Sequence, residues 1–414
     1  MKGNGNSGLS APARVAVFTH DTFGMGDVRR SLRILSALSE AAPGSALLLV
    51  TGSPALSAFS SLPPNVDVVK VPTAVSTGSR SSRSPHLPIA RAEVAKLRRD
   101  IIRQVIIGFA PDVFLVDNYP LGSENELLDT LHELRGQGAR IVLGLRDVLD
   151  APDVIRGEWE RQGMYELLER YFDRILVYGV ESVLDVRTAY RMPVSVALRV
   201  HYCGYVTHGV VAGQDRDLRA ALSIEGPYVV VTGGGGGDAY PLLKLSLEAM
   251  RQLPDTTTVL VAGPLMKVAE RDELRRLADG RPDVRVVDQL DDLPRWLAGA
   301  DAVISMCGYN TAAEIAALGL RAVVVPRTWR YGEPIHNGGA GVEWEQLLRA
   351  QALTRLGYVQ LLEPERADSA RLAEAVRACL AAPRPAPAVP LRLDGVRTVT
   401  DQILRLIQER RRHA

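Results

Sequence analysis

A two-domain α/β fold with parallel sheets is predicted by two features of the sequence. Short runs rich in Val, Ile and Leu alternate with helical patterns, which is typical of parallel sheets covered by helices on both faces. The strand spacing breaks near residues 205–215, after which a new strand and a second glycine-rich turn restart the pattern. The expected strands are "RVAVFTH", "SALLLVTG", "DVFLVDN", "RIVLGL", "DRILVYG", "PYVVVTG", "TTVLVAG", "DVRVVD", "DAVIS" and "RAVVVP".

The restart divides the chain into an expected N-terminal domain, residues 14–208, and a C-terminal domain, residues 209–385. A length of 414 residues with 46% apolar side chains is enough for two cores of ordinary size. The proline-rich stretch "PRPAPAVP" then connects to an expected helix over residues 391–411, which could cross back to the first domain.

The composition argues against several classes of function. The formal net charge of +1 and the lack of a nucleic-acid motif argue against a nucleic-acid partner and favour a small-molecule partner. Cys203, Cys307 and Cys379 form no CxxC pair, and no His/Cys/Asp cluster has metal-ligand spacing, so neither a disulfide framework nor a metal site is expected. No apolar run reaches the roughly 18 residues of a membrane span, and "MKGNGNSGLSAPA" is not a signal peptide. We expect a cytoplasmic protein.

The first candidate site is the turn in "VFTHDTFGMGDVRR", where a strand gives way to a helix near Asp27. Open parallel sheets bind ligands at the carboxyl ends of their strands, where the helix N-terminus offers unpaired amides. Alternatively, the glycines only permit a tight turn and Asp27 only caps the helix. The site interpretation assigns catalysis to Asp27 or His20 and acceptor binding to Asp21, Gly24, Met25 and Gly26.

The second candidate site is the run Gly233 to Gly237, between a strand and a helix expected to begin near Asp238 or Pro241. Consecutive glycines let backbone amides approach a diphosphate closely. A nicotinamide-type motif is disfavoured because no acidic residue follows the next strand, and a P-loop because no Gly-Lys-Ser/Thr follows. A merely flexible loop is the remaining alternative.

The third candidate site is "ISMCGYNTAAEIAALGLRAVVVPR". Here Ser305 ends a strand, a turn follows, and a helix is expected to carry Glu314 in its first turn before Gly319 ends it. A carboxylate there can accept hydrogen bonds from both hydroxyls of a ribose. Equally, Thr311-x-x-Glu314 has the pattern of a capping box, which would explain both residues without a ligand.

Together with "GLRDVLDAPDVIRGEW", "DRILVYG" and "YCGYV", these motifs resemble bacterial predicted glycosyltransferases related to family 28, the group that includes the peptidoglycan N-acetylglucosaminyltransferases. The resemblance covers most of residues 14–365. It implies a GT-B fold, with two Rossmann-like domains facing across a cleft, the acceptor on the first and the nucleotide-sugar on the second.

The resemblance also implies residue roles. Glu314 would bind the donor ribose, the Gly233 to Gly237 run would lie near the diphosphate, and Glu345 with Gln346 would meet the sugar hydroxyls. The reaction would be an inverting hexosyl transfer from a nucleotide-sugar, with UDP the expected nucleotide, to a small-molecule or lipid-linked acceptor. No cofactor and no metal would be needed. The other donor-side candidates are Gly308, Asn310 and Thr311.

Relatives usually have Gly-x-Gly-His in the first turn, with the histidine as the candidate base, whereas this chain has Gly24-Met25-Gly26-Asp27. We therefore expect Asp27 to be the general base, with His20, oriented by Asp21, as the second candidate. Residues 328–342 look like an insertion at the rim of the site.

Other functions share these features. A nucleotide-sugar 2-epimerase also uses two facing Rossmann-like domains, and a non-catalytic nucleotide-sugar-binding protein would tolerate the change of His to Asp. For a lipid-linked acceptor, the basic helical stretch "RAEVAKLRRDIIRQVIIGF" offers a peripheral membrane contact, although most such faces are simply solvated.

Overall fold

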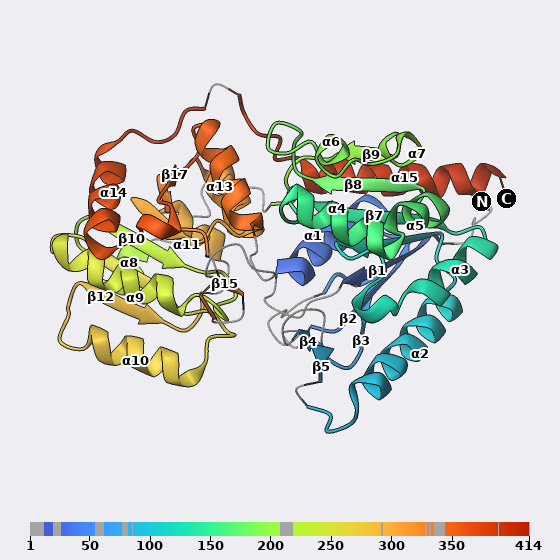
Figure 1. The fold of residues 1–414 in the computed structure, drawn as a ribbon, viewed down its shortest axis with the longest axis horizontal. Coiled ribbons are helices and arrows are strands. Elements are labelled where there is room, and N and C mark those ends of the chain that lie inside the picture. The colour runs from blue at the N-terminus through green and yellow to red at the C-terminus, as the bar shows by residue number, and fades with distance from the viewer. Residues whose placement is uncertain are drawn as a thin grey trace, which may run out of the picture.

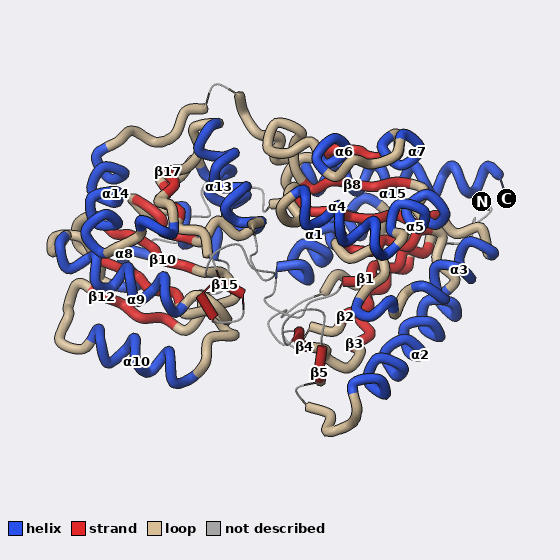
Figure 2. Tube along the Cα trace, in the orientation of Figure 1, coloured by secondary structure: helices blue, strands red, loops and turns tan. Residues whose placement is uncertain are grey.

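The computed structural model shows two α/β domains side by side, each with a parallel sheet between layers of helices (Figure 1, Figure 2). Among the described residues, no helix combines the length and the apolarity needed to cross a bilayer. The structure describes residues 12–19, 26–53, 62–76, 82–84, 86–207, 218–290, 293–327, 329–330, 333–334, 344–387 and 389–413.

The first domain is built on a sheet that has seven strands in the described part of the chain, in the spatial order β3-β2-β1-β6-β7-β8-β9. Every neighbouring pair is parallel. The central strands are buried on both faces because helices cover both, which explains their continuous apolar runs. The strands are β1 (Arg14–Thr19), β2 (Ala46–Thr51), β3 (Val66–Lys70), β6 (Val113–Asp117), β7 (Arg140–Arg146), β8 (Arg174–Tyr178) and β9 (Val200–Tyr202).

Helices connect these strands and cover the sheet (Figure 2). A short antiparallel hairpin, β4 (Val75–Ser76) with β5 (Ser82–Arg83), precedes α2. The helices of the first domain are α1 (Gly26–Ala41), α2 (Arg91–Phe109), α3 (Leu128–Gly136), α4 (Pro152–Gln162), α5 (Met164–Tyr171), α6 (Val186–Ala189) and α7 (Val194–Ala197).

The second domain repeats this plan with a sheet of six described strands, in the spatial order β12-β11-β10-β13-β14-β17. All its neighbouring pairs are parallel. The strands are β10 (Tyr228–Thr232), β11 (Thr257–Val261), β12 (Val284–Val287), β13 (Ala302–Ser305), β14 (Ala322–Val324) and β17 (Gln360–Leu361).

The helices of the second domain again alternate with its strands. A second antiparallel hairpin, β15 (Trp329–Arg330) with β16 (Glu333–Pro334), lies within the expected insertion, most of which is outside the described residues. The helices are α8 (Leu218–Leu222), α9 (Tyr240–Ala249), α10 (Val268–Ala278), α11 (Leu293–Ala298), α12 (Tyr309–Leu318), α13 (Glu345–Arg355) and α14 (Ser369–Ala381).

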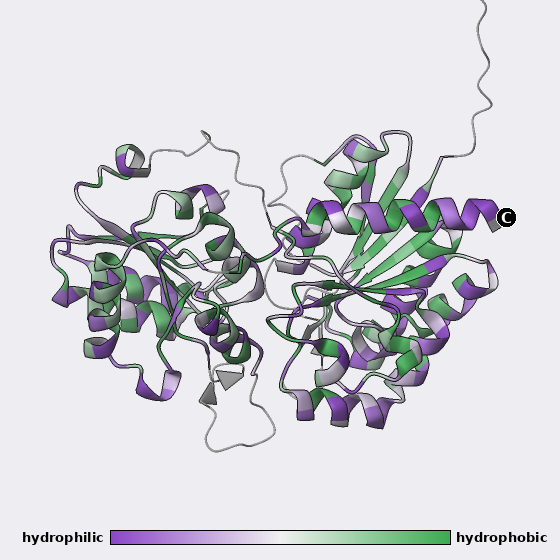
Figure 3. Cartoon of the chain, turned by 90° about the horizontal axis from the view of Figure 1, so that it is seen from above, coloured by the Kyte–Doolittle hydropathy of each residue, from purple (hydrophilic) through white to green (hydrophobic). Residues whose placement is uncertain are grey.

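The last helix, α15 (Gly395–His413), returns to the first domain and packs against α1, β6 and β7 (Figure 1). Its apolar residues face the sheet and its polar residues face outward (Figure 3). Arg174 Nη2 of β8 donates to Glu409 Oε1 of α15 at 2.8 Å. The first domain therefore contains the N-terminal half of the chain and also its last helix.

All ten apolar runs form strands in the structure, which confirms the predicted two parallel sheets. In each sheet the strand order reverses beside the first strand, between β1 and β6 and between β10 and β13. Crevices at the carboxyl ends of strands at such a reversal are the usual ligand sites of open α/β sheets. The start of α1 and the turns after β10 and β13 therefore occupy the expected positions for a site.

Candidate functional site

The start of α1 and the start of α12 meet across the domain interface. The first residue of α1, Gly26, lies so close to Asn310 in the first turn of α12 that an added Cβ would come within 2.5 Å of Asn310 Nδ2. At the same interface, the Val206 amide donates to the Tyr309 hydroxyl at 3.3 Å. The N-termini of α1 and α12 thus face one another, each after a strand at the reversal point of its own sheet.

Asp27, in the first turn of α1, belongs to a buried group of charges with Arg30 and Asp117, which we call the strand-end cluster. Arg30 Nη2 donates to Asp27 Oδ1 at 2.6 Å and to both carboxylate oxygens of Asp117 at 2.9 Å. The Arg30 and Asp117 side chains are fully buried, whereas Asp27 keeps 17% of its side chain exposed. Asp27 is therefore the member of the cluster whose side chain is accessible from solvent.

Aromatic rings from both domains enclose the Arg30 guanidinium. Its central carbon lies 5.1 Å from the ring centre of Tyr178 on β8 and 5.2 Å from that of Tyr309 on α12. Burial lowers the pKa of Arg30, but Asp117 and Asp27 outweigh burial and hold that pKa well above its ordinary value. Burial raises the pKa of Asp117 to about 6, against the opposing effect of Arg30.

Glu314 is placed differently from the sequence expectation. Helix α12 begins at Tyr309 with Gly308 as its N-cap, so Glu314 lies beyond the first turn. The capping-box alternative is therefore wrong, because Thr311 is inside the helix and not at its N-cap. Glu314 instead accepts a hydrogen bond from Arg33 Nη2 of α1 at 3.2 Å, across the domain interface.

A second buried group, Arg146, Asp147, Glu345 and Arg349, also joins the domains; we call it the interdomain arginine network. Arg349 of α13 donates to Asp147, which follows β7, through Nη2 at 2.7 Å and Nε at 3.0 Å. Glu345 Oε1 accepts from Arg349 Nη2 at 2.9 Å and from Arg146 Nη1 at 3.0 Å. Burial raises the pKa of Glu345, but Arg146 and Arg349 outweigh it and hold the pKa below its ordinary value.

Two neighbouring residues extend this contact. The backbone amide of Trp344 donates to Asp150 Oδ1 of the first domain at 2.8 Å. Gln346 Oε1 accepts from the Arg327 amide at 3.0 Å, inside the second domain. The start of α13, where the sugar was expected, is therefore held from both domains.

The glycine-rich turn after β10 is a compact folded loop. Gly236 has φ +91°, and an added Cβ there would lie 2.1 Å from the Ala262 carbonyl oxygen. The Gly235 carbonyl accepts from the Leu265 amide at 2.9 Å, and the Gly234 amide donates to Thr232 Oγ1 at 3.1 Å. The alternative of a merely flexible loop is wrong for Gly234 to Gly236, because their conformation is fixed against the following turn.

This geometry predicts different effects for two glycine substitutions. Gly236→Ala should lower the free energy of unfolding by about 3 kcal/mol or more, because a backbone clash adds to the left-handed strain. Gly234→Ala, at φ +72° with nothing within 4 Å of its added Cβ, should cost only about 1 to 2 kcal/mol. Urea denaturation of the two variants makes the comparison, and equal losses would contradict it.

The structure brings several expected site residues together. Gly26 and Asp27 at the start of α1 lie across the domain interface from Asn310 and Glu314 of α12, and Glu345 separately contacts the first domain through Arg146. His20, Asp21, Gly24 and Met25 lie outside the described residues.

The sequence reading missed six charged residues at the interface. A usable signal was present, because Asp117 ends β6 and Arg146 with Asp147 ends β7, at the sheet edge where ligands bind. The helical arginines gave no such signal and look like surface residues in the sequence. The missed residues are Arg30, Arg33, Asp117, Arg146, Asp147 and Arg349.

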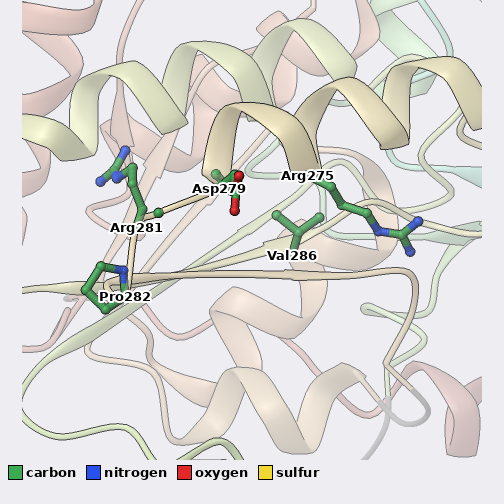
Figure 4. Close-up of a pocket in the computed structure, with 7 residues that line it drawn as sticks. Arg275, Asp279, Arg281, Pro282 and Val286 are labelled. Carbon is green, nitrogen blue, oxygen red and sulfur yellow. The ribbon is translucent and has the colours of Figure 1, made fainter.

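No group of three or more potential metal ligands is found among the described residues. A hollow between the end of α10 and β12 lies at the outer edge of the second domain, away from the interface (Figure 4). Its two arginines, Arg275 and Arg281, point away from one another, and each has a neighbouring aspartate partner. This hollow therefore does not gather polar groups around a ligand.

Comparison with known proteins identifies the second domain. Residues 228–388 match the glycosyltransferase family 28 C-terminal domain. A stretch of 161 residues is 29% identical to a UDP-N-acetylglucosamine–N-acetylmuramyl-(pentapeptide) pyrophosphoryl-undecaprenol N-acetylglucosamine transferase from Rubrobacter xylanophilus. That match covers 39% of this chain and 42% of the relative, so it spans less than half of either protein.

Solved structures share the fold over the whole chain. The glycosyltransferase of kitacinnamycin superposes with a TM-score of 0.60 at 18% identity, covering 96% of this chain and 99% of its own. A structure described as a putative UDP-N-acetylglucosamine 2-epimerase from Listeria monocytogenes also gives 0.60, at 12% identity and 96% coverage of both chains. These likenesses show the GT-B fold. In sequence, residues 228–388 are similar to the glycosyltransferase family 28 C-terminal domain, and part of the chain is similar to a bacterial N-acetylglucosamine transferase.

Proposed function

We propose that this protein is an inverting, hexosyltransferase-type glycosyltransferase that moves a sugar from a uridine nucleotide-sugar to a small-molecule or lipid-linked acceptor. The observation that carries the proposal is the match to the family 28 C-terminal domain, in which the N-terminal turn of α12 lies against Gly26 at the start of α1, next to Asp27. Glu314 would bind the ribose, the Gly233 to Gly237 loop would lie near the diphosphate, and Asp27 would accept the acceptor's proton.

A 2-epimerase is the second candidate, because an epimerase has the same fold. At 12% identity that likeness concerns the fold alone, whereas the family 28 match concerns sequence at the glycine loop and α12. The transferase is therefore favoured. A non-catalytic nucleotide-sugar-binding protein would use the same donor residues without turnover.

Incubation with a panel of nucleotide-sugars, with and without candidate acceptors, separates the three functions. A transferase releases the nucleotide diphosphate in proportion to glycosylated acceptor, with inverted configuration at the sugar's anomeric carbon. Product formed from the donor alone would indicate an epimerase. Binding without any product would indicate a sensor.

Donor affinity should depend on Glu314. Replacing Glu314 by Ala should weaken UDP binding by ~1.5 to 3 kcal/mol, because hydrogen bonds from the ribose to a charged group are lost. Isothermal titration calorimetry measures the change, and Glu374→Ala on exposed α14 is a control expected to bind like wild type. Unchanged affinity in a folded Glu314→Ala protein would remove Glu314 from the donor site.

Catalysis should proceed without an added metal ion. The N-termini of α9 and α12 and the glycine amides can offset the charge that grows on the departing diphosphate. We expect full turnover in excess chelator. Strict dependence on magnesium or manganese, restored by adding the ion back, would contradict this mechanism.

A further inference from the structure

The neighbour of Glu314 in the first domain has hydrogen-bond donors that have no partner among the described residues. Arg33 lies on α1 with 11% of its side chain exposed, and Glu314 faces it with 7% exposed. Arg33 Nη2 donates to Glu314 Oε1 at 3.2 Å, whereas charge-assisted hydrogen bonds in paired geometry are typically about 2.7 to 2.9 Å. Nε and Nη1 of Arg33 are buried and have no hydrogen-bond partner in the described structure.

The other interface arginines differ from Arg33. Arg349 donates from Nε, Nη1 and Nη2 to partners within 3.1 Å. Arg30 also leaves Nε and Nη1 without described partners, but two aromatic rings stack on its guanidinium. Arg33 is therefore a buried cation at the donor face with donors to spare, an arrangement that is costly unless an anion satisfies it.

Asn310 offers a hydrogen-bond acceptor near Arg33 that has no partner among the described residues. Its Oδ1 is buried without a partner among the described residues, and it lies one turn before Glu314 on α12. The carboxylate of Glu314 is thus flanked by donors on Arg33 and an acceptor on Asn310, all without partners among the described residues. A nucleoside diphosphate supplies the matching chemistry, since its phosphate oxygens accept hydrogen bonds and its ribose hydroxyls donate them.

We propose that Arg33 is a donor-binding residue that the first domain contributes to the nucleotide-sugar site. Its guanidinium pairs with the diphosphate while the ribose hydroxyls replace Arg33 on Glu314. Without donor, the Arg33–Glu314 pair keeps both charges compensated, and with donor each charge has a partner on the nucleotide. This inference rests on the proposed function and adds that phosphate recognition requires both domains.

The test compares ligands that differ only in phosphate. UDP and uridine are titrated calorimetrically into wild type, Arg33→Gln and Arg33→Lys, with Arg397→Gln as a control on exposed α15. Arg33→Gln should weaken UDP binding about 10- to 100-fold, the effect of losing hydrogen bonds to a charged group, and should leave uridine binding unchanged or tighter. Arg33→Lys should fall between, because it keeps the charge but loses the planar fork.

The outcomes separate this inference from the proposed function. If wild type binds neither UDP nor uridine, the proposed uridine-nucleotide function fails. If wild type binds UDP and folded Arg33→Gln binds it equally well or better, the Arg33–Glu314 pair only holds the two domains together. In that case the inference fails. Equal weakening for UDP and uridine would also overturn it, because the effect would not act through phosphate.

Discussion

Replacing Asp27 by Asn is expected to lower turnover about 100- to 10,000-fold while leaving donor affinity intact. Asn keeps the shape of the side chain but cannot take a proton from the acceptor. The strand-end cluster explains why the loss should be confined to catalysis: Arg30 is held by both oxygens of Asp117 and so remains paired when Asp27 loses its charge. Steady-state kinetics at saturating donor, together with calorimetric donor binding, measures both quantities.

The Asp27–Arg30 contact bears on how Asp27 acts. A carboxylate that accepts from an arginine at 2.6 Å is fixed in orientation, which favours catalysis. Arg30 also donates to the buried Asp117, so the same guanidinium holds both carboxylates. The arrangement therefore fixes the position of the proposed base.

Two further variants decide whether Asp27 is the base. Asp27→His introduces the residue that the family resemblance implies at this place and should retain more turnover than Asp27→Asn. His20→Gln should cost less than Asp27→Asn. Near-wild-type turnover in Asp27→Asn would contradict the assignment and leave His20 as the candidate, whereas a loss of acceptor affinity alone would make Asp27 an acceptor-binding carboxylate.

The fold was predictable because its signal is repeated. Each central strand is a continuous apolar run covered on both faces, and the glycine turn after β1 has its counterpart after β10. The edge strands β3, β9 and β17 were missed because they are short or partly exposed and carry weaker apolar patterns. Hydrophobic patterns therefore predict strands that are buried on both faces, but not short edge strands that are partly exposed.

Site residues could be predicted only where the local chain conformation requires a particular residue type. The glycines of the loop after β10 were found because left-handed backbone and close approach require them, as Gly236 shows. Arg30 has no such local reason: it is fully buried because its partners Asp117 and Tyr309 come from distant parts of the chain. Such pairings depend on how the two domains meet, which no local pattern encodes.

The second large effect is expected at Arg349, the most completely paired link between the domains. Arg349→Met should lower the free energy of unfolding by about 3 to 5 kcal/mol, because Asp147 would remain buried without its cation. Both side chains are fully buried, and Asp147 Oδ2 also accepts from the Tyr205 hydroxyl at 2.7 Å. Urea denaturation measures the stability, and small-angle X-ray scattering should show a larger radius of gyration as the domains separate.

Matched variants show whether the buried charge is the cause. Arg275→Met breaks a half-exposed pair with Asp288 and should cost less than about 1 kcal/mol. Arg349→Met combined with Asp147→Asn should cost less than Arg349→Met alone, because removing the second charge removes the uncompensated burial. If the double variant is instead the less stable, the loss comes from packing around Arg349. If Arg349→Met leaves both the stability and the radius of gyration unchanged, other contacts hold the domains together. The next contacts to test would then be the Arg33–Glu314 pair and the stacking of Tyr178 and Tyr309 on Arg30.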